Sequence, residues 1–156
     1  MKKEYLLVLV IALFVLSSVL DSLSGPLKLA LKNPFYFLKP AVIAVYPFTA
    51  VSIGMKTTFL FISALLALSV IEKKYLAKGV FLLFLSALLE LYSIQQIATG
   101  SQRITLEWSI ALAFSGVALI LPAVLYFVMG IIKLIHSRLK EINYPYSQEQ
   151  ETEEDL

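Results

Sequence analysis

The sequence of 156 residues contains no cysteine, and histidine occurs only once, as His136. The lack of cysteine excludes disulfide bonds, thiolate metal ligands, cysteine nucleophiles and dithiol redox chemistry. A single histidine provides neither a histidine-rich metal site nor a pair of axial haem ligands. We therefore predict no metal site, no cofactor and no catalytic residue, and glycine-rich phosphate loops, His-Glu-x-x-His and Gly-x-Ser-x-Gly motifs are also missing from the sequence.

Charged residues are scarce as well. They make up 15% of the chain, whereas 59% of the residues are apolar and the mean hydropathy is +0.83. A typical soluble domain has about 25% charged and about 45–50% apolar residues. The composition therefore excludes an ordinary water-soluble fold and a disordered chain, and the length allows one domain. We predict an all-α integral membrane protein.

The few charges are distributed unevenly along the chain. The formal net charge is +2, but six acids and no base lie after residue 140. Upstream of that point the bases flank apolar runs instead of forming a stripe, which is typical of membrane anchoring and argues against a nucleic-acid partner. We predict a disordered, acidic, cytoplasmic tail at 141–156.

The apolar runs define the expected spans. We predict a single transmembrane domain over 1–140, a four-helix bundle whose spans cover about 5–23, 48–71, 79–98 and 106–134. The first run exceeds the 7–15 apolar residues usual in a signal peptide, so we expect a retained anchor. Proline is tolerated within membrane helices, so Pro122 is expected to kink the last span without ending it.

The segment 24–47 is expected to be an irregular re-entrant or interfacial piece after the first helix. Four prolines interrupt residues 26–47, and an aromatic triplet lies between Lys32 and Lys39, which is typical of the headgroup level. Residues 41–55 are too short for an easy crossing, at about 22 Å of helix. In an alternative interpretation, residues 41–55 cross the membrane independently and form a fifth span. We favour a tilted helix continuing from about 48 to 71, with Lys56 extending outward to water.

Lysine and arginine positions indicate the orientation. Four spans with a cytoplasmic N-terminus place more bases inside than outside, and five spans with an external N-terminus also satisfy the positive-inside rule. Both arrangements put the C-terminus in the cytoplasm. We therefore predict a multi-pass protein of the cell membrane with a cytoplasmic C-terminus.

Glu90 is the most informative single residue, because it falls about 16 Å into the third span at helical rise. A carboxyl group at that depth is costly unless it faces protein or water. Helical spacing places Ser86, Ser93 and Gln96 on the same face, so we expect Glu90 to point into the bundle with them. A proton, cation or substrate site and a hydrogen-bonded packing residue are both open interpretations.

Two further residues complete the set of binding candidates. Asp21 ends the first span, where a carboxylate that meets nearby lysines is the simpler interpretation, and Arg103 lies in the connector before the last span. In the four-span arrangement both fall in the outer half with Glu90. They could then line an external polar pocket suited to acid–base chemistry, although the sequence does not show that Asp21 and Glu90 converge.

Three functions follow from these features, in order of preference. A chain this small, with four helices, favours a non-enzymatic subunit, scaffold or accessory of a larger membrane assembly, with membrane lipid and protein partners or self-association. The alternative is an oligomeric carrier or channel for ions or small solutes that uses Glu90. The third is a small intramembrane enzyme acting on a lipid-linked substrate at the outer face. An enzyme is the less expected class.

Overall fold

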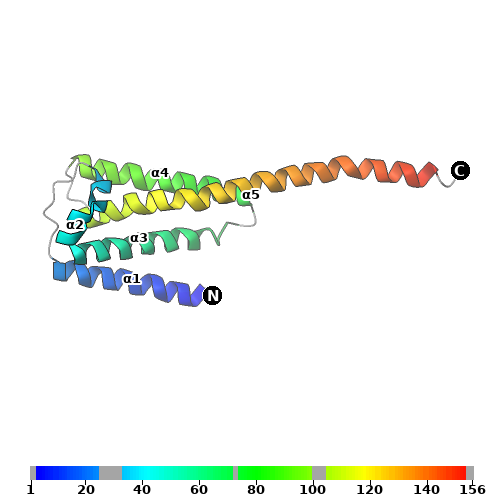
Figure 1. Ribbon diagram of the computed structural model, residues 1–156. Helices are drawn as coiled ribbons and strands as arrows, with labels where there is room; N and C mark the ends of the chain where they lie inside the picture. Colours follow the sequence, from blue (N-terminus) through cyan, green and yellow to red (C-terminus); the bar gives the residue numbers. More distant parts are fainter. Residues whose placement is uncertain (1–2, 25–32, 72–73, 100–104, 154–156) are drawn as a thin grey trace.

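The computed structural model describes residues 3–24, 33–71, 74–99 and 105–153, with only the backbone described from residue 141 on. These residues are helical, without a strand (Figure 1). Four helices are long, namely α1 (Lys3–Ser24), α3 (Pro47–Ala67), α4 (Tyr75–Thr99) and α5 (Leu106–Glu153), and two are short, namely η1 (Pro34–Leu38) and α2 (Pro40–Val45). The predicted all-helical fold is confirmed.

The four long helices are long and apolar enough to cross a membrane, as predicted. Their apolar windows face outward to a large extent, since only 6% of the window in α1 and 17–22% of those in the other three are buried. Hydrophobic burial drives the folding of water-soluble domains, so exposed apolar helices on this scale suit a lipid solvent instead. The six-residue α2 ends before Pro47, so residues 41–55 do not form an independent helix of spanning length.

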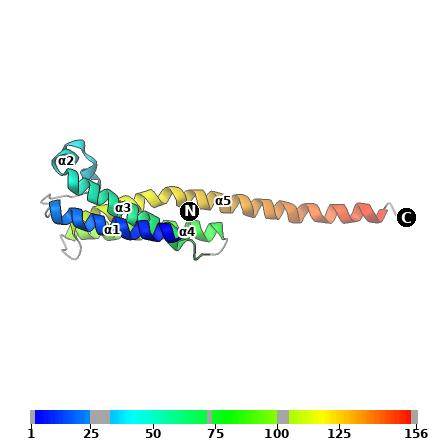
Figure 2. The same ribbon diagram turned by 90° about the horizontal axis from the view of Figure 1, so that it is seen from below.

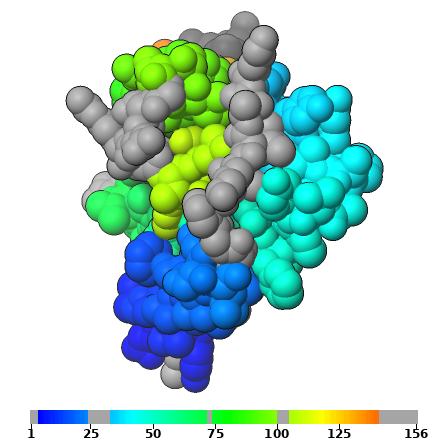
Figure 3. Space-filling model, turned by 90° about the vertical axis from the view of Figure 1, so that its left-hand side faces the viewer, coloured from blue at the N-terminus to red at the C-terminus, as the bar shows by residue number. Residues whose placement is uncertain are grey.

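The long helices lie in a row in the order α4, α5, α3, α1 (Figure 1). Helix α1 packs antiparallel to α3, and α4 packs antiparallel to α5, whereas the central helices α3 and α5 run in the same direction. Figure 2 shows η1 and α2 to one side of this row. The end-on view in Figure 3 places α1 and α4 at opposite edges, with η1 and α2 beside them.

The proline-rich segment forms a cap at one end of the row. Asn33 accepts a hydrogen bond from the Phe35 amide at 2.9 Å, and prolines occupy the first turn of η1, α2 and α3, where no amide donor is needed. Phe37 is only 2% exposed and packs with Ile53 and Ile110. It therefore lies inside the protein instead of in the predicted aromatic belt, because η1 turns it toward α3 and α5.

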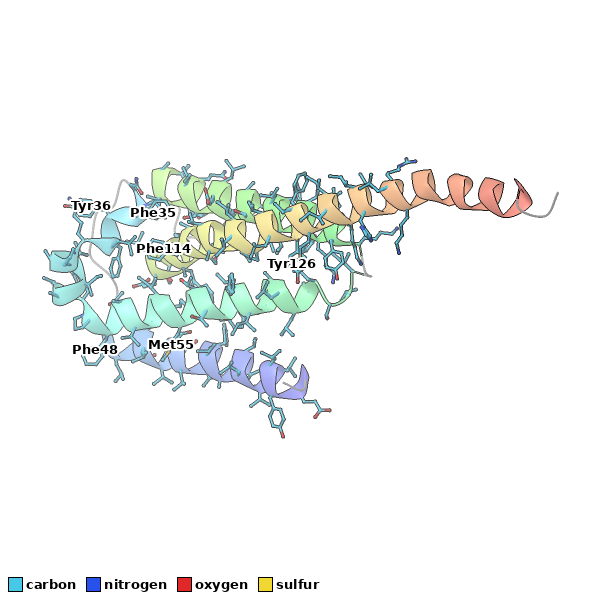
Figure 4. The ribbon with its side chains drawn as sticks, turned by 45° about the vertical axis from the view of Figure 1, so that its right-hand side comes forward. Phe35, Tyr36, Phe48, Met55, Phe114 and Tyr126 are labelled. Carbon is cyan, nitrogen blue, oxygen red and sulfur yellow. The ribbon has the colours of Figure 1, made fainter. Side chains whose placement is uncertain are left out.

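The other two aromatic side chains of this cap differ from each other. The rings of Phe35 and Phe114 approach within 5.6 Å between centroids and point toward one another in Figure 4. Tyr36 is 47% exposed, and the Lys39 ammonium lies 4.1 Å from the centre of its ring. Phe35 is exposed as well, at 38%, but it is Tyr36 with Lys39 that combines exposure with an amphipathic contact.

Helix α5 is a single element of 48 residues that continues through Pro122. It extends well beyond the other helices (Figure 1) and carries the backbone of residues 141–153 in helical form. The segment expected to be a disordered tail, 141–156, is thus described as helix over 141–153, and residues 154–156 lie outside the described residues. Glu and Gln, which make up six of residues 141–153, have high intrinsic helix propensity, so this segment can continue an established helix without a tertiary contact.

Candidate functional site

An ion pair links α1 to α3 within the apolar part of the row. The Lys56 ammonium donates to the Asp21 carboxylate and to the Ser52 hydroxyl, the latter at 2.9 Å. Ser52 in turn donates to the other oxygen of Asp21 at 2.5 Å and contacts the Ser17 carbonyl oxygen at 3.3 Å. We call Asp21, Ser52, Lys56 and Trp108 the Asp21–Lys56 cluster. One polar network therefore joins the two helices.

Burial in the Asp21–Lys56 cluster is unequal. Lys56 is fully buried, whereas 30% of the Asp21 side chain is exposed. The prediction that Lys56 extends outward to water is wrong. Side chains on a helix point toward its N-terminus, so the lysine does lean toward the η1–α2 end of the row. It meets Asp21 on the way, because antiparallel packing of α1 places this carboxylate one turn earlier along α3, at Ser52.

Aromatic rings enclose the ion pair. The Lys56 ammonium lies 5.3 Å from the centre of the Trp108 ring, a distance suited to a cation–π interaction. Phe14 lies 5.5 Å from Phe59 and 6.1 Å from Trp108 between ring centroids, so this triad joins α1, α3 and α5. The rings exclude water from one side of the pair, which strengthens its electrostatic attraction.

The second group of candidate residues lies between α4 and α5. Ser86 donates to the Gly116 carbonyl oxygen at 2.7 Å, and Ser93 donates to the Ser109 carbonyl oxygen at 2.6 Å. Both serines are buried, and their hydroxyl groups join the two helices directly. Backbone carbonyls that already accept helical hydrogen bonds can accept a second one from a neighbouring helix, which is a common means of association in membranes.

Glu90 lies on the same face of α4 and is half-buried. A Cβ atom at Gly116 would come within 2.8 Å of its Cγ, so the glutamate stem lies directly over this glycine. Gln96, one turn beyond Ser93, is 6% exposed, and its Oε1 atom has no hydrogen-bond partner among the described residues. The structure thus places Ser86, Glu90, Ser93 and Gln96 along one line of contact with α5.

A repeat of small residues explains why these helices approach so closely. Small residues recur at every seventh position, at Gly79, Ser86 and Ser93 in α4 and at Ser109, Gly116, Ala123 and Gly130 in α5, and all seven are buried. We call this set the α4–α5 seam. A Cβ at Gly79 would lie 3.0 Å from the Ala123 carbonyl oxygen, and one at Gly130 would lie 2.9 Å from the Leu76 amide nitrogen. Each glycine therefore permits backbone contact.

The sequence contained this signal, but a search for Gly-x-x-x-Gly spacing misses it. The period of seven is that of a left-handed helix pair, in which one face of each helix stays turned toward its neighbour. Antiparallel pairing then matches Gly79 with Ala123, Ser86 with Gly116 and Ser93 with Ser109. Two aligned heptads of small residues are therefore a stronger predictor of this interface than any four-residue motif.

The remaining sequence candidates separate in space. Asp21 belongs to α1 at one edge of the row and Glu90 to α4 at the other, so the two carboxylates do not share a pocket (Figures 1 and 3). Arg103 lies outside the described residues. Glu107, in the first turn of α5, is 6% exposed. The described residues contain no group of three His, Asp or Glu side chains placed to hold a metal ion.

Comparison with known proteins identifies no relative from which a function could be transferred. No protein-family model, curated protein sequence or solved structure matches this chain. The function must therefore be inferred from the arrangement of its own residues.

Proposed function

We propose that this chain is a multi-pass protein of the cell membrane that acts without catalysis, as a subunit, scaffold or accessory of a larger assembly. Its four long helices satisfy their backbone hydrogen bonds internally, which is what a lipid environment requires. Their apolar surface is left largely uncovered by the chain itself. The C-terminus lies in the cytoplasm in this proposal, since the bases near the start of α4 and those at 133–140 in α5 favour that side.

One observation carries the choice of a packing function over catalysis. The described polar candidates mostly hold neighbouring helices together, as the hydrogen bonds of Ser86 and Ser93 and the ion pair of Lys56 illustrate. The enzyme alternative needs Asp21 and Glu90 in one pocket, whereas they belong to opposite edges of the row. We therefore do not propose an enzyme.

The row supports a partner-binding function by its shape. A closed bundle gives every helix two neighbours, whereas α1, among the described residues, packs mainly on α3 and contacts α5 through the Phe14–Trp108 ring pair. Association with other membrane helices, from a partner or from a second copy, would complete the contacts of such an edge helix.

Two experiments test the proposal in sequence. Retention of the chain in membranes after alkaline carbonate washing, with a reporter fused after residue 140 active only in the cytoplasm, supports the membrane placement. Extraction by carbonate, or a reporter active outside, contradicts it. Purification of a tagged chain in mild detergent after in-membrane crosslinking should then give defined heteromeric or homomeric adducts, and a crosslink-free monomer would contradict the packing function.

A carrier or channel is the second candidate, and the α4–α5 contact favours it in one respect. Half-buried Glu90 and buried Gln96 lie on the same line, and the Gln96 carbonyl oxygen has no hydrogen-bond partner among the described residues. Ionisable groups within a membrane often mark transport pathways. The carrier is favoured if the wild-type chain carries an ion or solute flux into liposomes and the folded Glu90→Gln variant does not. If the wild-type chain carries no flux, and if Glu90→Leu loses stability whereas Glu90→Gln does not, packing is favoured.

A further inference from the structure

A basic groove lies between the start of α4 and the neighbouring part of α5, and it is lined by residues from 74–77 and 130–140. It has a volume of about 750 Å³, within the range of roughly 300–1,000 Å³ that is usual for ligand sites. We call its lining the α4–α5 fork, which consists of Lys74, Tyr75, Leu76, Ala77, Gly130, Lys133, Leu134, His136, Ser137 and Lys140. Three of these residues are lysines, and no acid is among the described residues that line the groove. The groove is therefore suited to an anion.

The fork is shaped by close packing and by aromatic contacts. Because Gly130 has no side chain, the backbone of Leu76 can approach α5 closely, and both residues line the groove. The Lys133 ammonium lies 4.6 Å from the centre of the Tyr75 ring, which holds it at the groove. Tyr75 stacks in turn on Tyr126 at 6.3 Å, the residue labelled at this end of the row in Figure 4.

The position of the fork along the helices points to a lipid rather than a soluble anion. Tyrosine and lysine are the residues that mark the boundary between acyl chains and headgroups. Exposed apolar residues continue from the fork along both helices, in the direction away from the polar end of α5. Val80 lies one turn after Leu76 in α4, and Phe127 lies two turns before Leu134 in α5. A phosphate at the lysines would thus have acyl-chain contacts directly beneath it.

We propose that the α4–α5 fork binds the phosphate headgroup of an anionic phospholipid, with its acyl chains along Leu76, Val80, Phe127 and Leu134. Lys74, Lys133 and Lys140 supply the charge, and the Tyr75 phenol is an additional hydrogen-bond donor at the groove. This inference rests on the proposed membrane placement of α4 and α5.

The test uses the purified full chain in detergent, with lipid binding measured by native mass spectrometry. Phosphatidylglycerol should bind more tightly than phosphatidylcholine by a factor of ten or more. A juxtamembrane lysine contributes about a fivefold gain in affinity for anionic lipid, so Lys74→Gln with Lys133→Gln should weaken phosphatidylglycerol binding about 25-fold. Lys39→Gln is the matched control, because this lysine also lies over a tyrosine ring but at the opposite end, and it should bind as the wild type does.

The proposal is overturned if phosphatidylglycerol and phosphatidylcholine bind with equal affinity. It is also overturned if the double variant binds phosphatidylglycerol as tightly as the wild type does, or if Lys39→Gln weakens this binding as much as the double variant does. Inorganic phosphate that competes at the same concentration as the lipid would assign the groove to a soluble anion and overturn it as well. If the double variant does not fold, photoactivatable phosphatidylglycerol on the wild-type chain decides: adducts within 74–77 and 130–140 support the fork, and adducts elsewhere refute it.

Failure of this inference is distinguishable from failure of the proposed function. If carbonate extracts the chain from membranes, both the proposed function and the proposed lipid site are contradicted. A chain that stays in the membrane, forms crosslinked assemblies and binds both lipids equally retains its proposed packing function and lacks only the selective lipid site.

Discussion

The α4–α5 pair and the α1–α3 pair are held together in different ways. Between α4 and α5, small residues at every seventh position allow the backbones to touch, and serine hydroxyls add hydrogen bonds to carbonyl oxygens. Between α1 and α3, the conspicuous contact is the ion pair of Asp21 with Lys56, closed by aromatic rings. The polar contacts of the first pair are spread along the helix length, whereas those of the second pair are concentrated around Asp21 and Lys56.

This difference predicts different responses to substitution. A distributed interface loses a part of its stability with each change, because its contacts are numerous and individually small. A buried ion pair fails as a unit, because removal of one partner leaves the other as an uncompensated buried charge. The α1–α3 pair should therefore be the more sensitive to a single charge-removing change.

Asp21→Asn should have the largest effect. It leaves the fully buried Lys56 without its carboxylate, and breaking a buried pair in this way costs about 3–5 kcal/mol. The cysteine-free chain allows a direct readout, since Phe14→Cys with Phe59→Cys reports proximity of the two helices through a short bifunctional thiol crosslinker. We expect crosslinking to fall and the thermal midpoint in detergent to drop.

The double variant Asp21→Leu with Lys56→Met is the control for that change. It removes both charges together, and apolar replacement of a buried pair is often neutral or stabilising. Stability and crosslinking should return to near the wild-type values. A double variant as unstable as Asp21→Asn would show that the ion pair is not the contact on which the α1–α3 pair depends.

Gly79→Leu should have the next largest effect, on the other pair. A Cβ at this position already lies 3.0 Å from two backbone atoms of α5, which cannot move aside as a side chain can. Overpacking of this kind costs about 1–3 kcal/mol. Gly54→Leu is the matched control, because a Cβ at Gly54 has open space around it. Equal thermal midpoints for the two variants would contradict close packing along the α4–α5 seam.

Ser93→Ala should have the smallest effect of the series. It removes the hydrogen bond to the Ser109 carbonyl oxygen, and hydrogen bonds between membrane helices average about 0.6 kcal/mol. Ser22→Ala serves as the control, since the Ser22 hydroxyl is exposed and donates within its own helix at 3.1 Å. A loss above about 2 kcal/mol for Ser93→Ala would mean that the α4–α5 seam depends on this one bond and is not distributed.

The sequence predicted the features that depend on local composition. Long, predominantly apolar runs predicted four long helices, and helical spacing placed Ser86, Glu90 and Ser93 on one face of α4, where the structure also has them. Such features follow from residues within one helix, so no knowledge of neighbouring helices is needed.

Features that depend on pairing between helices were harder to predict. Lys56 was expected at a water-exposed level because α3 alone offers it no partner, and the partner on α1 is defined only once the antiparallel register is known. Phe37 was assigned to a surface belt from its neighbours in sequence, although η1 rotates it into the core. The length of α5 beyond residue 140 was missed because its acidic composition resembles that of disordered tails.

The length of α5 has a consequence for how the molecule interacts with ions around it. At helical rise its 48 residues extend about 72 Å, whereas a bilayer with its headgroups is about 40–45 Å thick. Glu149 lies nine residues beyond Lys140, about 13 Å along the axis, which exceeds the Debye length of about 8 Å at physiological ionic strength. Dissolved ions therefore screen the distal acidic residues from the lysines of the fork, and each charged region presents its own sign to its surroundings.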